Sequence, residues 1–238
     1  MRETFRENFK NVKKAIVEIE SRLQRQGGVQ LIGASKNVPT KLLYLAHEAG
    51  LKCFGENRAQ ELKMKAPQMP RDCEWHFIGP LQTNKVKDVI PWVTLIHSVD
   101  RADLVEEIEK RAESRGKTQK VLVEVNIGGE ASKHGVASEK ALELVEKVNQ
   151  CRHLEVHGLM TVAPFHVDLE RVRPFFQQLR ELRDSIEKQS GMLLPELSMG
   201  MSHDYKVAIE EGATMVRIGT ALFGEIRKEA KLLSSESP

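Results

Sequence analysis

Lys36 ends an apolar run, residues 31–36, that is followed shortly by Pro39. An apolar run bounded by Gly and Pro predicts a buried strand, so we expect this lysine to emerge at the edge of the core, partly desolvated. Desolvation disfavours the charged form of an amine. A neutral lysine amine is the usual nucleophile for a carbonyl group and forms the Schiff bases that hold pyridoxal phosphate. An ordinary strand-end lysine in solvent is the alternative interpretation.

Two segments near the C-terminus, residues 198–204 and 217–221, combine glycines with hydroxyl side chains. Glycine lets the backbone approach a bound anion closely, and Ser202 and Thr220 add hydroxyl donors. Backbone N–H groups at a helix N-terminus are a common phosphate-binding device. We therefore predict a phosphate site here. Helix capping by the two hydroxyls is the alternative, and it is compatible with anion binding.

Arg217 lies between Val216 and Ile218 near the end of a predicted strand, so its side chain should face away from theirs. A permanently charged group beside a pyridine nitrogen would hold that nitrogen unprotonated and make the ring a poor electron sink. A salt bridge from Arg217 to Glu56 or Glu124 is the alternative.

The elements that must position these residues follow from hydrophobic periodicity. An amphipathic helix from about Thr4 to Gln26 precedes eight predicted strands, which alternate with helices. This pattern predicts a single (β/α)8 TIM barrel, residues 1–231, with an extra N-terminal helix and a flexible tail, residues 232–238. An open doubly wound sheet is the alternative, but no Gly-rich dinucleotide motif follows the first strand. The predicted strands are 30–36, 52–57, 75–79, 95–99, 121–126, 156–160, 196–199 and 214–219.

The carboxyl ends of barrel strands form one rim, so residues scattered in sequence converge there. The strand bodies are mostly Val, Ile, Leu and Phe, and we therefore expect the polar residues at this end of the barrel only. The expected rim residues are Lys36, Asn57, His76 with Gly79, Ser98, Asn126, Thr161, Ser198–Ser202 and Arg217–Thr220.

The composition excludes several classes of function. The chain has 238 residues, with 36 Lys and Arg against 34 Asp and Glu and no basic run, so neither nucleic acid nor a membrane surface is expected as a partner. No apolar segment approaches the ~18 residues of a membrane span, and a cytoplasmic location is expected. Cys53, Cys73 and Cys151 form no C-x-x-C pair, which predicts reduced packing residues without a disulfide framework or a zinc site.

Six motifs, in order along the chain, resemble those of the pyridoxal phosphate homeostasis proteins. Each motif alone is weak, but six in order from about Leu31 to Gly224 are highly specific. The motifs are GASK at 33–36, GEN at 55–57 with QE at 60–61, HFIGPLQTNK at 76–85, GLMT at 158–161, SMGMS at 198–202 and VRIGT at 216–220.

The resemblance implies a barrel related to the N-terminal domain of fold-type III enzymes such as alanine racemase, with pyridoxal phosphate bound as an internal aldimine on Lys36. It implies that Arg217 faces the pyridine nitrogen and that Ser202, Gly219 and Thr220 hold the phosphate. Asn57 and Met160 would line the surroundings of the ring. Ser198 and Met199, from the same motif as Ser202, complete the predicted cofactor-binding set.

The enzyme hypothesis is amino-acid racemization, which needs two acid/base groups on opposite faces of the ring. Lys36 would be one of them. In alanine racemase the other is a tyrosine on a separate domain of the partner subunit, whereas the only tyrosines here, Tyr44 and Tyr205, are on predicted helices. A phosphosugar isomerase would need a carboxylate base and a neutral histidine at the rim, but His76 is early in its strand and we expect no Glu to close one.

A binding protein needs no second acid/base group. We therefore predict a non-catalytic protein that holds pyridoxal phosphate and buffers vitamin B6 or delivers it to pyridoxal phosphate-dependent apo-enzymes, with a monomer favoured over a dimer. Lys85, Lys87 and Lys133, with His134, form either an electropositive approach to the barrel mouth or a solvated face.

Overall fold

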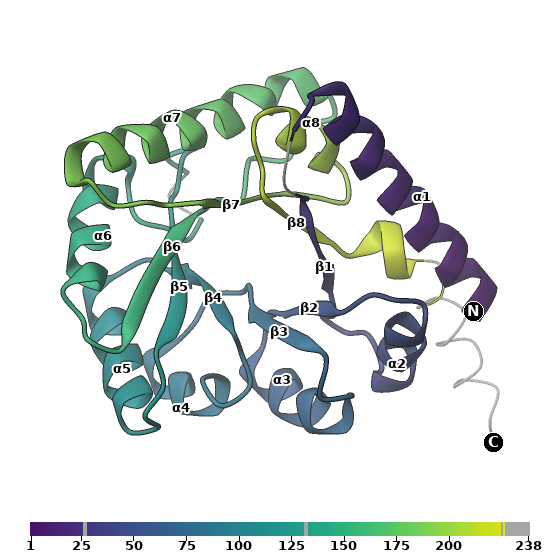
Figure 1. The fold of residues 1–238 in the computed structure, drawn as a ribbon, viewed down its shortest axis with the longest axis horizontal. Coiled ribbons are helices and arrows are strands. Elements are labelled where there is room, and N and C mark those ends of the chain that lie inside the picture. Colours follow the sequence, from purple (N-terminus) through teal and green to yellow (C-terminus); the bar gives the residue numbers. More distant parts are fainter. Residues whose placement is uncertain (26–27, 131–132, 225, 227–238) are drawn as a thin grey trace.

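The computed structural model describes residues 1–25, 28–130, 133–224 and 226, and its eight parallel strands close into a barrel in sequence order (Figure 1). The predicted (β/α)8 architecture is confirmed, and the strand boundaries differ from the predicted ones by a few residues at most. The strands are β1 (Gln30–Ala34), β2 (Cys53–Glu56), β3 (Glu74–Phe77), β4 (Leu95–Val99), β5 (Gln119–Glu124), β6 (Leu154–Met160), β7 (Glu196–Met201) and β8 (Met215–Ile218).

Helices connect successive strands and surround the barrel (Figure 1). A further helical segment begins at Thr220, after β8. The predicted tail, residues 232–238, lies outside the described residues. The helices are α1 (Arg2–Arg22), α2 (Thr40–Glu48), α3 (Ala59–Lys65), α4 (Val86–Val89), α5 (Ala102–Glu113), α6 (Ala141–Asn149), α7 (Arg173–Ser190) and α8 (Tyr205–Glu210).

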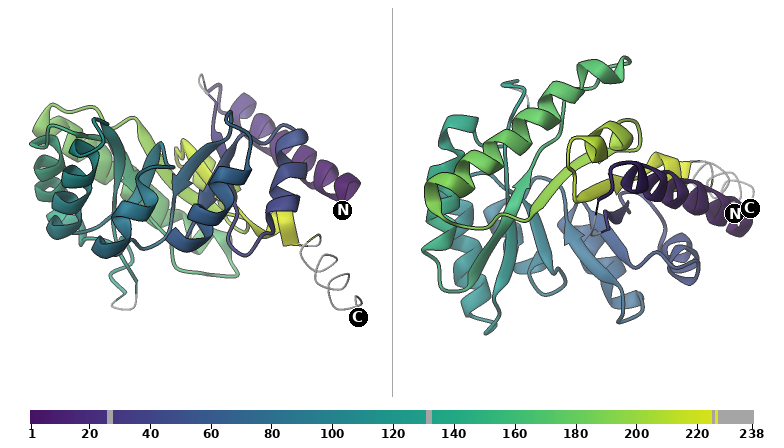
Figure 2. Two further views of the ribbon diagram at one scale, coloured as in Figure 1. Left: turned by 90° about the horizontal axis from the view of Figure 1, so that it is seen from below. Right: turned by 45° about the horizontal axis from the view of Figure 1, so that its top comes forward.

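The extra N-terminal helix, α1, lies across the outside of the barrel beside α8 (Figures 1 and 2). Its apolar residues recur every three or four positions, so they share one face and are buried against the barrel. The Phe5 ring stacks on Phe223, with 5.4 Å between ring centroids, and Asn8 donates a hydrogen bond to the Leu222 carbonyl. Helix α1 therefore joins the start of the chain to the segment that follows β8.

The barrel interior is more polar than the sequence led us to expect. Strand register places Glu74 and His76 of β3, His97 of β4 and Ser198 of β7 on the inner face. The expectation that polar residues lie at the rim alone is wrong, because each of these residues points inward while the mostly apolar residues that alternate with it along the strand face the helices. The apolar residues that fill the rest of the interior are Ile32, Cys53, Leu95, Leu122, Met160 and Met215.

Cys53, Cys73 and Cys151 are free thiols, and burial raises the pKa of each, so they pack as uncharged groups. Among the described residues, no helix combines the length and the apolar character that crossing a membrane requires. The cytoplasmic location stays a prediction from the sequence.

Candidate binding site at the barrel mouth

Lys36 lies in a turn, the second residue after β1 ends at Ala34, and it is exposed. The expectation of a partly desolvated lysine at the last strand position is wrong, because the strand ends earlier and Asn37 turns the chain with a left-handed φ of 57°. The Lys36 amine makes no hydrogen bond or ion pair with any residue that the structure describes. The amine is therefore free to meet a ligand at the carboxyl ends of the strands.

Hydrogen bonds to β2 and α3 fix the turn that carries Lys36. The Ser35 N–H donates to the Gly55 carbonyl at 2.9 Å, and Ser35 Oγ lies 2.8 Å from Glu56 Oε1. The Asn37 N–H donates to Glu61 Oε2 at 2.9 Å. The residues on both sides of Lys36 are thus fixed to β2 and α3 while the lysine side chain itself stays free.

The buried lysine of this region is Lys65, the last residue of α3, which the sequence analysis missed. Its Nζ donates to the Ser35 carbonyl at 2.8 Å, to Glu56 Oε1 at 2.5 Å and to Glu61 Oε2 at 2.7 Å. In the sequence, Lys65 follows Ala59 and Leu62, which are also buried, at a regular spacing of three. This spacing places Lys65 on the buried face of the helix and could have predicted its burial. Because Glu56 faces the helix layer and pairs with Lys65, it is not the partner of Arg217.

Arg217 points into the barrel, and only 5% of its surface is exposed. Its Nη1 donates to Ser198 Oγ at 2.5 Å and its Nη2 donates to the Thr161 carbonyl at 2.8 Å. Burial lowers the pKa of Arg217 to about 10, against the opposing effect of the Glu124 and Asp204 charges, so the side chain remains a cation at neutral pH. No carboxylate among the described residues forms an ion pair with it.

The loops after β7 and β8 meet through Ser202. Its Oγ accepts hydrogen bonds from the N–H groups of Gly219 at 3.0 Å and Ala221 at 3.2 Å, at the start of the helical segment. The neighbouring Thr220 is exposed. Capping by Ser202 therefore occurs, and it gathers a hydroxyl and a helix N-terminus in the place where we predicted an anion to bind.

Gly200 lies near the end of β7, within the register shift between Ser198 and Met201. Its φ is 93°, and a Cβ atom at this position would lie 2.6 Å from the Cβ of Ala208. A side chain at residue 200 would therefore strain the backbone and displace α8.

The remaining predicted ligand contacts lie at different depths. Ser198 and Met160 are fully buried and face the interior, at the same level as each other. The Met199 side chain instead packs in the hydrophobic core between sheet and helices, so this residue can reach a ligand only through its backbone. Asn57 follows β2 and is partly buried.

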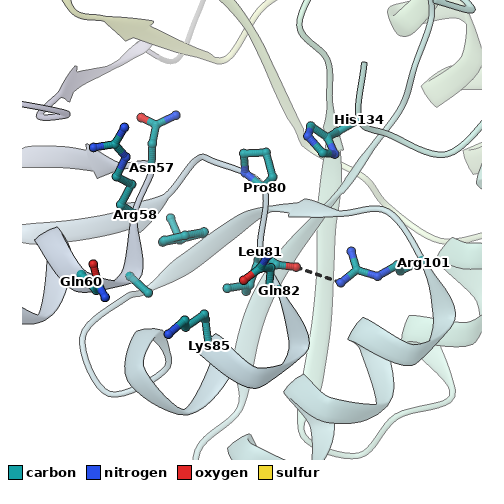
Figure 3. A pocket seen from close by; sticks show the side chains of 11 residues that line it. Asn57, Arg58, Gln60, Pro80, Leu81, Gln82, Lys85, Arg101 and His134 are labelled. Atoms are coloured by element: carbon teal, nitrogen blue, oxygen red, sulfur yellow. Dashed lines mark hydrogen bonds between the residues drawn. The ribbon is translucent and has the colours of Figure 1, made fainter. Parts of the chain in front are cut away.

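A cavity of about 620 Å³ adjoins the mouth through Asn57 (Figure 3). Arg58, Lys85, Arg101 and His134 also line it, and Arg101 donates to the Leu81 carbonyl. Lys85 and His134 thus share a cavity, as the electropositive approach requires, whereas Lys87 lines a separate one and Lys133 pairs with Glu130. Lys36 and Arg217 lie outside this lining.

Glu124 closes β5 and faces the interior, in register with Met160. The expectation that no Glu closes a strand is wrong, because β2 and β5 both end on one. Burial raises the pKa of Glu124 to about 7, an effect that the Asp100 charge reinforces and the Arg217 charge opposes. The mouth therefore holds a carboxyl group that titrates near neutral pH.

We expect Glu124→Gln to stabilise the ligand-free protein at high pH. The pKa of Glu124 is raised to about 7 on folding from an ordinary ~4.3, so its contribution to stability is lost as the pH rises between these values. Relative to the parent, the free energy of unfolding of the variant should therefore rise by about 3 kcal/mol between pH 4 and pH 8. Urea unfolding at both pH values measures this. A difference that does not change with pH would show that Glu124 ionises normally.

Residues 5–227 match the family model of the alanine racemase N-terminal domain. Over 197 residues the chain is 53% identical to the pyridoxal phosphate homeostasis protein of Aquifex aeolicus. The alignment covers 82% of this chain and 86% of that protein. An unknown protein from Bifidobacterium adolescentis superposes with a TM-score of 0.88 at 37% identity, over 93% of this chain and 95% of the other. PipY of Synechococcus elongatus, solved with PLP bound, superposes with a TM-score of 0.76 at 34% identity, over 88% and 100% of the two chains.

Proposed function

Since this chain belongs to the family of alanine racemase N-terminal domains and pyridoxal phosphate homeostasis proteins, we propose that it binds pyridoxal 5′-phosphate at the barrel mouth and takes part in vitamin B6 homeostasis. One observation carries the proposal. A free lysine amine, on a turn that buried groups fix in place, shares the rim with a buried arginine and a helix N-terminus. These are the three groups that an aldehyde, a pyridine nitrogen and a phosphate would require.

Lys36 would hold the ligand covalently, since its amine has no competing partner among the described residues. When bound, pyridoxal phosphate supplies an aldehyde for this link and an electron-withdrawing ring. The exposure of Lys36 also lets solvent and incoming amines reach the link, which suits reversible loading and release. Buffering or delivery of the vitamin to apo-enzymes needs this reversibility.

Arg217 would face the ring nitrogen and donate to it. Because the guanidinium is a permanent cation, it disfavours a second positive charge on that nitrogen. The ring would then stay unprotonated and withdraw electrons poorly. Arg217 thus favours holding the ligand over reacting with it.

The phosphate would lie where Ser202 joins the loops after β7 and β8. The N–H groups of Gly219 and Ala221 already point at an oxygen there, the Ser202 hydroxyl. Thr220 is exposed beside them and offers a further hydroxyl. Because Ser202 Oγ accepts from both N–H groups, the hydroxyl proton of Ser202 is free to donate to a phosphate oxygen.

We propose that the protein is not an enzyme and acts as a monomer. Tyr44 is exposed on α2 and Tyr205 is buried on α8, and neither approaches Lys36 or Arg217 through a hydrogen bond in the described chain. Glu124 is the one observation that favours the alternative, an amino-acid racemase, because a carboxyl group with a pKa near 7 at the mouth is suited to acid/base work.

Hydrogen exchange at Cα separates the two functions. The protein loaded with pyridoxal phosphate is incubated with L- and D-amino acids in deuterated water, and loss of the Cα proton is followed by NMR. We expect no exchange beyond that of free pyridoxal phosphate, because a missing positioned acid/base group costs about 10² to 10⁴ in rate. Exchange that Lys36→Ala and Glu124→Gln each abolish would establish the racemase. Failure of the protein to bind pyridoxal phosphate at all would reject both.

A further inference from the structure

A continuous chain of hydrogen bonds crosses the barrel interior from Arg217 on β8 to Glu74 on β3. Beyond the contact between Arg217 and Ser198, Ser198 Oγ lies 2.8 Å from His97 Nδ1. His97 Nε2 lies 2.9 Å from His76 Nδ1, and His76 Nε2 lies 3.2 Å from Glu74 Oε1. Ser198 and His97 are fully buried and His76 is 1% exposed. None of these contacts beyond Ser198 is used by the proposed ligand site.

The two ends of the chain fix its direction. An arginine side chain can only donate hydrogen bonds, and an ionised carboxylate can only accept them. With Arg217 donating to Ser198, the Ser198 hydroxyl is free to donate to His97 Nδ1. His97 then donates through Nε2 to His76, and His76 donates through Nε2 to Glu74. Every donor and acceptor is satisfied when both imidazoles are neutral with the proton on Nε2.

A second arrangement of protons fits the same distances less well. His97 could donate from Nδ1 to Ser198 if His76 were a cation that donated to both His97 and Glu74. The Ser198 hydroxyl proton would then have no acceptor among the described residues, and a second cation would lie in the interior with Arg217. Burial lowers the pKa of His97 well below its usual value, and the nearby His76 and Arg217 lower it further, so His97 is neutral in either arrangement and the choice between them rests on the unpaired hydroxyl proton and the second buried cation.

Glu74 anchors the far end of the chain. Its carboxylate accepts hydrogen bonds from Thr94 Oγ1 and Gln30 Nε2, each at 3.0 Å, as well as from His76. The hydrogen bond from His76 lowers the pKa of Glu74, against the effect of burial, so the carboxylate is ionised at neutral pH. Glu74 also lines a cavity of about 480 Å³ at the amino ends of the strands, so its end of the chain is open to water.

We propose that His97, supported by His76 and Glu74, is the positioning residue of Arg217. By accepting a hydrogen bond from the Ser198 hydroxyl, His97 directs the Ser198 lone pairs towards the Arg217 guanidinium. This fixes the orientation of the guanidinium at the mouth. The inference deepens the proposed function, because it names the residues that aim Arg217 at the ligand's ring nitrogen. It also assigns a role to two buried histidines that no ligand contact explains.

The first test measures the protons directly in the ligand-free protein. Nitrogen-15 NMR of histidine-labelled protein distinguishes a protonated ring nitrogen from an unprotonated one, and His76→Gln and His97→Asn assign the signals. We expect Nε2–H and unprotonated Nδ1 on both residues at pH 7. A protonated His97 Nδ1, or a doubly protonated His76, would overturn the inference, whether or not the protein binds pyridoxal phosphate.

The second test asks whether His97 acts through the ring nitrogen. We expect His97→Leu to weaken pyridoxal phosphate binding by about tenfold, while binding of the analogue with C–H in place of the ring nitrogen changes less than about twofold. His97→Asn should restore most of the affinity, because its Oδ1 can accept from Ser198 as Nδ1 does. Ser98→Ala is the matched control, since Ser98 is a buried neighbour on β4 whose Oγ has no hydrogen-bond partner in the described chain.

Three results would overturn the inference. The first is an equal loss of affinity of His97→Leu for both ligands, which a general disturbance of the barrel would produce. The second is no loss of affinity for either ligand. The third is a loss of affinity in His97→Asn as large as that in His97→Leu. Circular dichroism checks that each variant is folded. Absence of pyridoxal phosphate binding by the parent protein would instead reject the proposed function and leave the NMR result to decide the hydrogen-bond chain.

Discussion

Lys36→Ala is expected to abolish the visible absorption band that marks pyridoxal phosphate bound covalently to a lysine. The Lys36 amine is the nucleophile in the proposed link, and an alanine methyl group cannot replace it. Because Lys36 is exposed and unpaired among the described residues, the substitution should change the free energy of unfolding by less than about 0.5 kcal/mol. The measurement is the absorption spectrum of each protein after loading and dialysis.

Two further variants make this result specific. Lys36→Arg keeps the positive charge without a usable nucleophile and should lose the band as fully as Lys36→Ala. Lys41→Ala removes another exposed lysine, five positions along on α2, and should keep the band. If Lys36→Ala retains a band that borohydride fixes to a different lysine, then Lys36 is not the attachment site.

The fold was predictable because each element carries its own periodic signal. Alternation of apolar strands with amphipathic helices is a local property, and short connections leave few ways to arrange eight such units. The boundaries were less predictable. Ser35 and Lys36 continue the run of β1 in sequence, but the hydrogen bonds that hold the turn after β1 go to Gly55 and Glu61, which the sequence does not reveal as neighbours.

The polar interior of the barrel was not predictable for a different reason. Both faces of a barrel strand are buried, so β3 and β4 give no solvent-facing positions from which to decide which way a residue points. His76 lies between Trp75 and Phe77, and the sequence alone does not decide whether its side chain faces the barrel interior or the helices. Only the register with neighbouring strands places it inside, within reach of His97.

The position of the candidate residues at the strand ends was predictable, whereas their surroundings were not, and their contacts with a ligand stay a prediction. Lys36, Arg217 and Ser202 do gather at one rim, because the strand ends must converge. However, the buried lysine is Lys65, and the titrating carboxyl group is Glu124. Burial depends on what α3 and the neighbouring strands place around a side chain, and a single stretch of sequence carries little of that information.

Lys65→Met is expected to destabilise the protein by about 3 to 5 kcal/mol, because it leaves Glu56 fully buried with no cation beside it. The methionine fills most of the volume of the lysine stem, so the loss reports the charge and the hydrogen bonds. For a chain of this length, such a loss lowers the melting temperature by roughly 10 °C. Thermal and urea unfolding of the ligand-free protein measure it.

Lys63→Met is the matched control on the same helix. Lys63 pairs with Asp88 at 3.2 Å on the surface, where 62% of the lysine side chain is exposed, and such pairs contribute about 1 kcal/mol or less. The double variant Lys65→Met with Glu56→Gln should regain part of the lost stability, because the uncompensated charge is gone. Equal effects of Lys65→Met and Lys63→Met would show that the buried pair contributes nothing beyond a surface one.

Lys65→Met should also weaken the binding of pyridoxal phosphate, because Lys65 supports the turn that carries Lys36. Lys65 binds the Ser35 carbonyl on one side of Lys36 and orients Glu61, which holds the Asn37 N–H on the other. Without Lys65 the Ser35 carbonyl loses its donor and Glu61 loses the cation that orients it, so part of the turn must be ordered when the ligand binds, at a cost of about 1 to 2 kcal/mol for each residue that is fixed. Affinity for pyridoxal phosphate should therefore fall by at least tenfold in Lys65→Met and stay unchanged in Lys63→Met. If affinity is unchanged in both variants while stability falls in one, Lys65 supports the fold and not the reactive lysine.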